Sequence, residues 1–317
     1  MGQADKKVIV ICGAGGCGKS TLVEDILFIN KKITRKGSTE KGNLTMDFDT
    51  EEIERKVSIQ LSIANISQNN STIYLIDTPG YHNFIGDALC GIRAADSAIL
   101  VVDIQEGVKA QTERFYYELE RENKPFIVFV NAIDKENSQF ANAFKSINEL
   151  FKAVAFQIPI KENDKVVGYI DTLNLKAYDF NQKDINLPDE LKEEANNYHS
   201  QIIEEVSSLN DELLENYLSG EELNKDLFNT TLKNAISSQK IIPLLVGSAL
   251  FGYNTQKLIE FADTYLPSAK NEGSTSKALV FKTYNDPQSG KLSLLRVLGG
   301  KFTPDTVYYN LNKDQEE

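Results

Sequence analysis

The chain has 317 residues, a length that predicts about two domains. Of these residues, 41% are apolar and 25% are charged, as in ordinary folded proteins. The formal net charge of −12 disfavours a protein that grips DNA or RNA over its whole surface. No run approaches the ~18 apolar residues that a membrane helix needs, and the polar N-terminus does not resemble a secretory signal. We therefore expect a cytoplasmic monomer with no membrane and no DNA partner.

Short apolar runs recur along the chain, and helix-like stretches alternate with them. The runs lie at residues 8–12, 73–76, 98–102, 126–130 and 241–246. Continuous apolar runs of this length predict strands that are buried on both faces. The sequence therefore predicts an α/β fold, a mostly parallel sheet with helices on both faces. One stretch differs, because Val57, Ile59, Leu61 and Ile63 alternate with polar residues and predict a half-exposed edge strand.

A different pattern between residues 156 and 240 predicts an α+β subdomain that is inserted before the last strand of the sheet. Strand-like stretches at 156–160 and 166–173 open this segment. After Pro188, apolar residues recur at spacings of three and four, which predicts a helix with one apolar stripe. The stripe consists of Leu191, Ala195, Tyr198, Ile202 and Val206.

The remaining residues complete the expected domain organisation. The sheet domain comprises residues 1–155 and 241–268, and the inserted subdomain comprises residues 156–240. A polar linker follows at 269–276. Residues 277–317 contain two strand-like pieces, 278–284 and 292–298, joined by a turn-rich segment at 285–290. These residues are too few for a closed barrel.

A glycine-rich segment follows the first apolar run and fits the pattern G-x-x-x-x-G-K-[ST] at every fixed position. Its glycines let successive backbone N–H groups surround phosphates, and the helix that follows adds its positive end. Lys19 is expected to reach the β- and γ-phosphates, and the Ser20 hydroxyl to bind Mg²⁺. The expected nucleotide-binding residues here are Gly13, Ala14, Gly15, Gly16, Cys17, Gly18, Lys19, Ser20 and Thr21.

Cys17 lies inside this loop and has two interpretations. The favoured one is a small residue at a position where bulk is not tolerated. The alternative is a reactive thiol whose pKa is lowered by the helix N-terminus.

Two further motifs follow the strands expected at 73–76 and 126–130. The first, Asp77-Thr78-Pro79-Gly80, offers a carboxylate for a Mg²⁺-bound water and a glycine N–H for the γ-phosphate. The second, Asn131-Ala132-Ile133-Asp134, offers a carboxylate that can accept both the N1–H and the 2-amino protons of guanine. Adenine offers neither arrangement, so such a site rejects adenine by ~10⁴-fold. Ser248 and Ala249, after the last strand, would supply backbone contacts to the guanine oxygen.

In this order the motifs resemble those of the translational GTPases. Further segments are similar to elongation factor G: residues 41–59 to its first switch, 107–113 to a helix start, and 157–178 to its inserted subdomain. Residues 247–250 and 265–267 close a resemblance that covers nearly all of residues 7–317. It implies a P-loop GTPase fold that ends with the start of a β-barrel domain. It also implies GTP and GDP as substrate and product, Mg²⁺ as cofactor, and the ribosome as partner.

Several residues depart from the family pattern. The family usually has histidine directly after Asp-Thr-Pro-Gly, where it positions the attacking water, but here Tyr81 holds this position and His82 follows. The catalytic candidates are therefore Tyr81 and His82, together with Lys19 and Gly80. A threonine that binds Mg²⁺ in relatives is Ser58 here, so the expected magnesium ligands are Ser20, Ser58 and Asp77.

The function expected from this resemblance is slow, ribosome-dependent GTP hydrolysis. Ala132 replaces the usual lysine of Asn-Lys-x-Asp, and Gly16 replaces an acidic residue, as in a divergent elongation-factor-G-like branch. Three alternatives remain open: a GTP-responsive binding module with little hydrolysis, a GTPase of the ribosomal-protection tetracycline-resistance type, and an ATP-using enzyme, which Asp134 disfavours.

An acidic cluster lies in the segment that resembles the first switch. A calcium loop would need glycine at its sixth position and glutamate at its twelfth, and the cluster has neither. We therefore expect a solvated segment. Its members are Asp47, Asp49, Glu51, Glu52 and Glu54.

Overall fold

The structure, a computed structural model, describes residues 5–286 and 290–316. The chain forms two compact units, Met1–Ser268 and Ala269–Glu317. The segments expected as linker and as the start of a further domain both fall in the second unit. Within the described ranges, no helix is long and apolar enough to cross a lipid bilayer.

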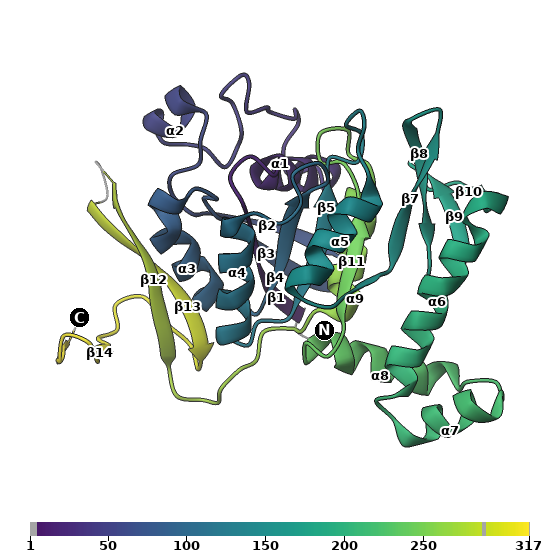
Figure 1. The fold of residues 1–317 in the computed structure, drawn as a ribbon. Coiled ribbons are helices and arrows are strands. Elements are labelled where there is room, and N and C mark those ends of the chain that lie inside the picture. Colours follow the sequence, from purple (N-terminus) through teal and green to yellow (C-terminus); the bar gives the residue numbers. More distant parts are fainter. Residues whose placement is uncertain (1–4, 287–289, 317) are drawn as a thin grey trace. The chain divides into compact units, whose positions relative to one another are not determined.

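A seven-stranded sheet forms the centre of the first unit (Figure 1). Every neighbouring pair is parallel except the first, in which the edge strand runs antiparallel to its neighbour. This arrangement confirms the predicted mostly parallel sheet. The strands lie in the order β2 (Ser62–Gln68), β3 (Ser71–Asp77), β1 (Asp5–Gly13), β4 (Ser97–Asp103), β5 (Phe126–Asn131), β11 (Ile242–Val246) and β6 (Ala153–Ala155).

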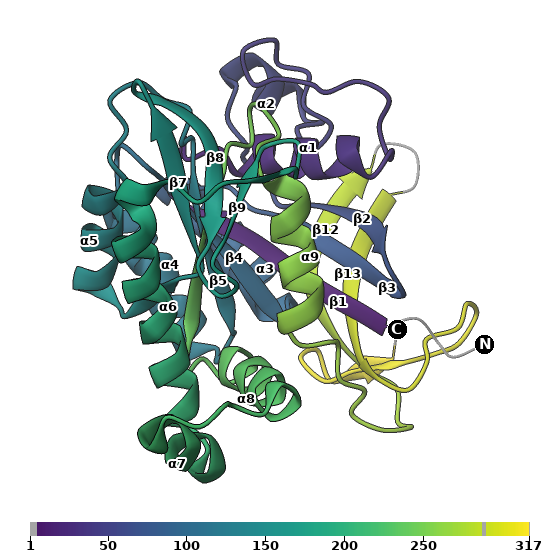
Figure 2. The ribbon, with the colours of Figure 1, turned by 90° about the vertical axis from the view of Figure 1, so that its right-hand side faces the viewer.

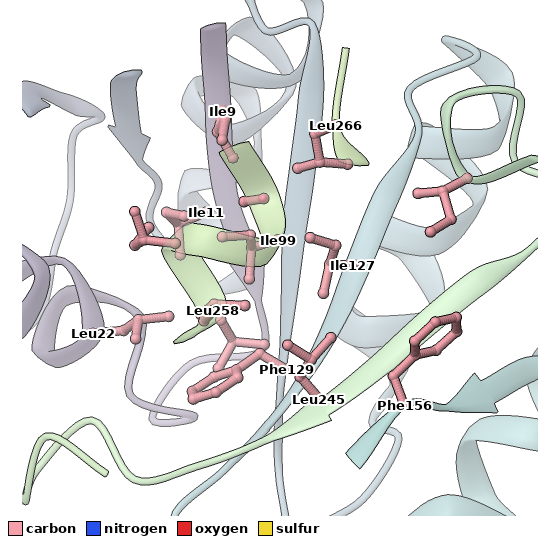
Figure 3. Close-up of a cluster of buried hydrophobic side chains, with 14 of the residues drawn as sticks. Ile9, Ile11, Leu22, Ile99, Ile127, Phe129, Phe156, Leu245, Leu258 and Leu266 are labelled. Carbon is pink, nitrogen blue, oxygen red and sulfur yellow. The ribbon is translucent and has the colours of Figure 1, made fainter. Parts of the chain in front are cut away.

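Helices cover both faces of this sheet, as the alternating pattern predicts (Figures 1 and 2). α1 (Lys19–Ile29) and α9 (Thr255–Tyr265) lie on one face. The other face carries α3 (Ile85–Ala94), α4 (Ala110–Arg121) and α5 (Phe140–Leu150). Figure 3 shows Leu22 of α1 and Leu258 of α9 in one buried cluster with strand side chains such as Ile9, Ile11 and Ile99.

The edge strand begins later than the alternation at residues 57–63 predicts. β2 starts at Ser62, and Ile63 is 38% exposed while Leu61 is fully buried. The backbone N–H groups of Ile59 and Gln60 donate to the Glu52 carboxylate, and not to a neighbouring strand. Because a side chain accepts the hydrogen bonds of these amides, residues 57–61 form an irregular loop. The preceding segment also contains a short helix, α2 (Thr50–Arg55).

The segment between β6 and β11 forms a four-stranded antiparallel sheet followed by three helices. The strand order is β10 (Asp184–Ile185), β9 (Lys176–Asp179), β8 (Lys165–Asp171) and β7 (Gln157–Glu162). The helices are α6 (Lys192–Ser207), α7 (Asp211–Ser219) and α8 (Lys225–Ser237). The predicted stripe is confirmed at Ala195, Ile202 and Val206, which are buried in α6. Leu191 lies just before α6, in a single 3₁₀ turn.

The second unit contains an antiparallel pair, β12 (Lys277–Asp286) and β13 (Gly290–Gly299), and a short pair, β14 (Tyr309–Asn310) and β15 (Gln315–Glu316). The strands predicted around 278–284 and 292–298 are thus confirmed. The centre of the predicted turn between them, residues 287–289, lies outside the described residues.

Candidate functional site

The predicted motifs meet at one edge of the central sheet. β1, β3, β5 and β11 belong to the parallel part of the sheet, and each predicted motif follows one of these strands. The register pairs Ile11 with Asp77 on β3, and Asp103 on β4 with Asn131 on β5. Because carboxyl ends of parallel strands face the same side, this edge is where ligands bind in open α/β sheets.

The glycine-rich loop between β1 and α1 needs glycine for conformation and for space. Gly16 and Gly18 have φ of 81° and 92°, the left-handed region that favours glycine. A Cβ atom on Gly18 would lie 2.3 Å from Nδ2 of Asn131, and one on Gly13 would lie 2.3 Å from the Val101 carbonyl oxygen. The loop is therefore packed directly against β4 and against the motif after β5.

Lys19 begins α1 and is almost completely buried. Its ammonium donates to the Ala14 carbonyl oxygen at 3.0 Å, which folds the side chain back along the loop. Gly80 lies directly against it, since a Cβ there would be 2.3 Å from Lys19 Nζ and 2.7 Å from the Gly15 nitrogen. The motif after β3 and the glycine-rich loop thus share one small space around a positive charge.

The three expected magnesium ligands lie close together. The Ser20 and Ser58 hydroxyl oxygens are 3.0 Å apart, and Ser58 donates to Asp47 Oδ1 at 2.7 Å. Asp77 is buried beside Ser20, and neither of its carboxylate oxygens makes a well-aligned hydrogen bond among the described residues. Burial raises the pKa of Asp77 to about 6, although Ser20 and Lys19 favour its ionised form.

This donor set fits a hard divalent cation. Buried carboxylate oxygens without partners and two neighbouring hydroxyls are the oxygen ligands that Mg²⁺ prefers. The described residues contain no cluster of three or more His, Cys, Asp or Glu side chains placed to hold a metal by themselves. An ion here would therefore need further ligands from a bound phosphate or from water.

A cavity of about 320 Å³ lies over these groups. It is bounded by the glycine-rich loop, the start of α1, the segment that precedes β2, and the motif after β3. The lining residues are Gly15, Gly16, Gly18, Lys19, Ser20, Thr21, Thr39, Leu44, Asp47, Lys56, Val57, Ser58, Thr78, Gly80 and Tyr81. The residues predicted to bind phosphate and magnesium therefore line one cavity, apart from the buried residues Gly13, Ala14, Cys17 and Asp77.

Asn131 links the glycine-rich loop to the loop after β11. Its Nδ2 donates to the Cys17 carbonyl oxygen at 2.8 Å, and its Oδ1 accepts from the Ala249 N–H at 2.9 Å. The Ala249 amide therefore already has a protein partner, which the sequence did not predict. Ser248 exchanges backbone hydrogen bonds with Tyr253, so residues 248–253 form a closed turn. We call this turn the base loop.

Asp134 has a buried oxygen that is free to accept. Its Oδ1 is buried and lacks a hydrogen-bond partner among the described residues. Ala132 adopts φ of 64°, in the left-handed region. An unpaired buried carboxylate oxygen is costly and normally marks a ligand site or a missing partner.

Tyr81 and His82 point to different neighbours. The Tyr81 ring covers the glycine-rich loop, since a Cβ on Gly15 would lie 2.8 Å from its Cζ atom, and the residue is 48% exposed. His82 does not line the cavity, and its Nδ1 lies 3.3 Å from Nη1 of Arg114 on α4. Of Tyr81 and His82, only Tyr81 lines the cavity, as the other two catalytic candidates, Lys19 and Gly80, also do.

Cys17 is fully enclosed. Only 2% of its surface is exposed, and burial raises the pKa of its thiol despite the nearby Lys19 ammonium. The structure therefore favours the interpretation of Cys17 as a small packing residue over that of a reactive thiol.

The prediction that the acidic cluster is solvated is wrong for two of its members. Asp47 is 8% exposed and Glu52 is 1% exposed. Glu52 accepts from the N–H groups of Asp49, Ile59 and Gln60. Glu52 is buried because an irregular segment needs acceptors for its amides, and Asp47 is buried as the acceptor of the Ser58 hydroxyl. The spacing of Asp49 and Glu52 is that of a capping box, which is present at α2 and was a usable signal.

Comparisons with known proteins agree with this geometry. The chain matches the family model described as elongation factor Tu GTP binding domain over residues 5–268. It is 32% identical over 327 residues to elongation factor G of Ureaplasma parvum serovar 3 and to that of Mycoplasma genitalium, with 95% of this chain and 48% of each relative covered. A crystal structure of a Thermus thermophilus protein matches with a TM-score of 0.89 and 27% identity, over 96% of this chain and 47% of that one. The chain spans about half the length of the curated relatives it matches.

Proposed function

The chain belongs to the elongation factor Tu GTP-binding domain family, among its elongation-factor-G-like members, and on that premise we propose that it binds and hydrolyses GTP with Mg²⁺ at the ribosome. It would do so as a cytoplasmic factor that alternates between a GTP-bound and a GDP-bound conformation. The observation that carries the proposal is a set of buried carboxylate oxygens without well-aligned partners, both oxygens of Asp77 at the carboxyl end of β3 and Oδ1 of Asp134 just beyond β5. Asp77 suits a cation beside phosphates, and Asp134 suits a base that donates hydrogen bonds.

Phosphate binding follows from the loop and the helix that it precedes. Gly15, Gly16 and Gly18 line the cavity, where their backbone N–H groups would surround phosphates, and the N-terminus of α1 adds a positive partial charge. Lys19 now donates to Ala14, and we expect it to exchange this carbonyl for phosphate oxygens when nucleotide binds.

Ser20, Ser58 and Asp77 are the residues that would hold Mg²⁺, with Asp47 orienting the Ser58 hydroxyl. When bound, Mg²⁺ supplies positive charge that offsets the negative charge of the β- and γ-phosphate oxygens. Without it, the two buried carboxylates Asp47 and Asp77 would face a polyanion.

Guanine recognition rests on Asp134 and on the base loop. Guanine presents two donors on one edge, and a carboxylate that stays unpaired with adenine makes the wrong base costly. Asn131 holds the loop that binds phosphate and the loop that surrounds the base in one hydrogen-bonded unit. Phosphate and base sites are thus positioned by a common side chain.

Tyr81 is the proposed water-positioning residue. Its ring lies over Gly15 at the rim of the cavity, and its hydroxyl can both donate and accept a hydrogen bond. A phenol is a weaker base than imidazole, so orientation of water, and not proton removal, is the contribution we assign to it. Hydrolysis would then be slow until a partner improves the geometry.

Calorimetry with GDP and ADP tests the nucleotide preference, and single-turnover GTP cleavage with and without ribosomes tests the reaction. We expect a clear preference for GDP, and cleavage that ribosomes accelerate. Equal binding of the two diphosphates would contradict the proposal as a whole. Binding without ribosomal acceleration would contradict only the translational part.

A second candidate function, a GTP-responsive binding module with little hydrolysis, is favoured by one observation. His82 contacts Arg114 and does not line the cavity, so no imidazole among the described residues is placed to orient water in this conformation. Single-turnover cleavage separates the two functions, because a binding module would leave GTP intact even with ribosomes present.

A further inference from the structure

Lys36 joins three segments that surround the candidate nucleotide site. It follows α1 and opens the segment of residues 36–60, which carries Ser58. Its ammonium lies 2.7 Å from Asp25 Oδ1 on α1, 2.7 Å from the Ala249 carbonyl oxygen, and 2.9 Å from the Leu250 carbonyl oxygen. An ammonium has three donors, and all three are used here.

The surroundings make this contact a strong one. The Asp25 side chain is 3% exposed and the Lys36 side chain 23% exposed, so the ion pair is partly shielded from water, and its hydrogen bond is charge-assisted. The neighbouring residue is fixed as well, because the Gly37 N–H donates to Glu24 Oε1 at 2.7 Å. Lys36 therefore cannot move away from the base loop without breaking contacts to both α1 and that loop.

The base loop is held through its backbone from two directions. The Ala249 N–H donates to Asn131, and the Ala249 carbonyl accepts from Lys36. On the opposite part of the loop, a Cβ on Gly252 would lie 3.2 Å from Asp25 Oδ1, so α1 packs closely there too. The position of the loop thus depends on a lysine from a distant segment of the chain.

We propose that Lys36 is a positioning residue for base recognition, which holds the base loop in the conformation that accepts guanine and ties it to residues 36–60. This inference rests on the proposed binding of guanine nucleotides. Lys36 touches neither base nor phosphate in this assignment. It acts through the carbonyl groups of Ala249 and Leu250 and through Asp25.

The test compares Lys36→Met with Lys36→Arg and with Lys41→Met, which changes an exposed lysine of the same segment. We expect Lys36→Met to weaken GDP binding roughly tenfold in calorimetry, as loss of charge-assisted hydrogen bonds implies, and to leave ADP binding unchanged. Lys36→Arg should restore part of the loss, and Lys41→Met should match the unchanged protein. Hydrogen exchange of the Ser248 and Tyr253 amides should accelerate in Lys36→Met alone.

The outcomes distinguish failure of the role assigned to Lys36 from failure of the proposed guanine-nucleotide binding. If the unchanged protein shows no preference for GDP over ADP, the proposed function fails and this inference fails with it. If that preference is present and Lys36→Met retains it in full, only the role of Lys36 is overturned. Equal losses of GDP and ADP binding, with a lower melting temperature, would show a structural role and would also overturn it.

Discussion

Glu52→Ala should release the segment that carries Ser58 while leaving the rest of the protein folded. The Glu52 carboxylate accepts N–H groups at 2.8 Å from Ile59, 2.9 Å from Gln60 and 3.1 Å from Asp49. Hydrogen bonds to a charged group contribute about 1.5 kcal/mol or more each, so the three total at least about 4.5 kcal/mol. Hydrogen bonds from these amides to water replace part of this stabilisation when the loop opens. We therefore expect local opening to become easier by about 2 kcal/mol, or roughly 30-fold.

Hydrogen exchange read at single residues measures this effect. The Ile59 and Gln60 amides should exchange roughly 30-fold faster in Glu52→Ala than in the unchanged protein. Glu54→Ala is the matched control, because Glu54 is an exposed glutamate on the same short helix. In this control the two amides should exchange at the original rate. Unaltered protection of Ile59 and Gln60 in Glu52→Ala would refute the argument that a buried carboxylate orders this segment.

Three further predictions use other parts of the molecule. Tyr81→Phe should lower single-turnover GTP cleavage by roughly tenfold or more and leave GDP affinity unchanged in calorimetry; an unchanged rate would exclude water positioning by the phenol. Lys7→Met should cost about 1–3 kcal/mol in urea unfolding, because the buried ammonium donates to two carbonyl groups at the end of α9. Burial lowers the pKa of Lys7, so between its folded and unfolded pKa values the unfolded chain binds more protons. The stability of the unchanged protein relative to Lys7→Met should therefore rise with pH across that window, and a flat difference would contradict this. In thiol labelling of the native protein, Cys90 should react first and Cys90→Ser should remove that phase, because Cys12 and Cys17 are buried.

The parts of the molecule that could be predicted from sequence are those governed by periodicity or by fixed spacing. Continuous apolar runs predicted the parallel strands, since burial on both faces favours apolar side chains along most of each strand. The motif G-x-x-x-x-G-K-[ST] predicted the turn between β1 and α1, because Gly16 and Gly18 adopt the left-handed backbone conformation that favours glycine. In both cases the residues that decide the structure are neighbours in sequence.

The parts that could not be predicted depend on contacts between distant residues. Alternation at residues 57–63 suggested a strand. Instead, the Glu52 carboxylate accepts hydrogen bonds from the Ile59 and Gln60 amides, and the Asp87 carboxylate accepts one from the Leu61 amide. No sequence pattern indicated the role of Lys36, because its partners Asp25, Ala249 and Leu250 lie at up to 214 residues from it along the chain. Composition cannot separate a solvated acid from one buried against backbone amides.

These distant contacts bear on how the segment before β2 could change conformation. A paired strand would be fixed by a continuous ladder of backbone bonds, and its release would expose the edge of the sheet. Residues 36–61 are instead held by separate carboxylates. Glu24 accepts hydrogen bonds from the Gly37 and Thr45 amides. Asp47 accepts one from the Ser58 hydroxyl, and Glu52 accepts one from the Ile59 amide. Each such contact breaks at a cost of a few kcal/mol and leaves β2 paired with β3. If the chain binds GTP as proposed, a segment anchored in this way would respond to one added or removed phosphate, because the free energy of binding one charged group is of the same size as each contact that orders it.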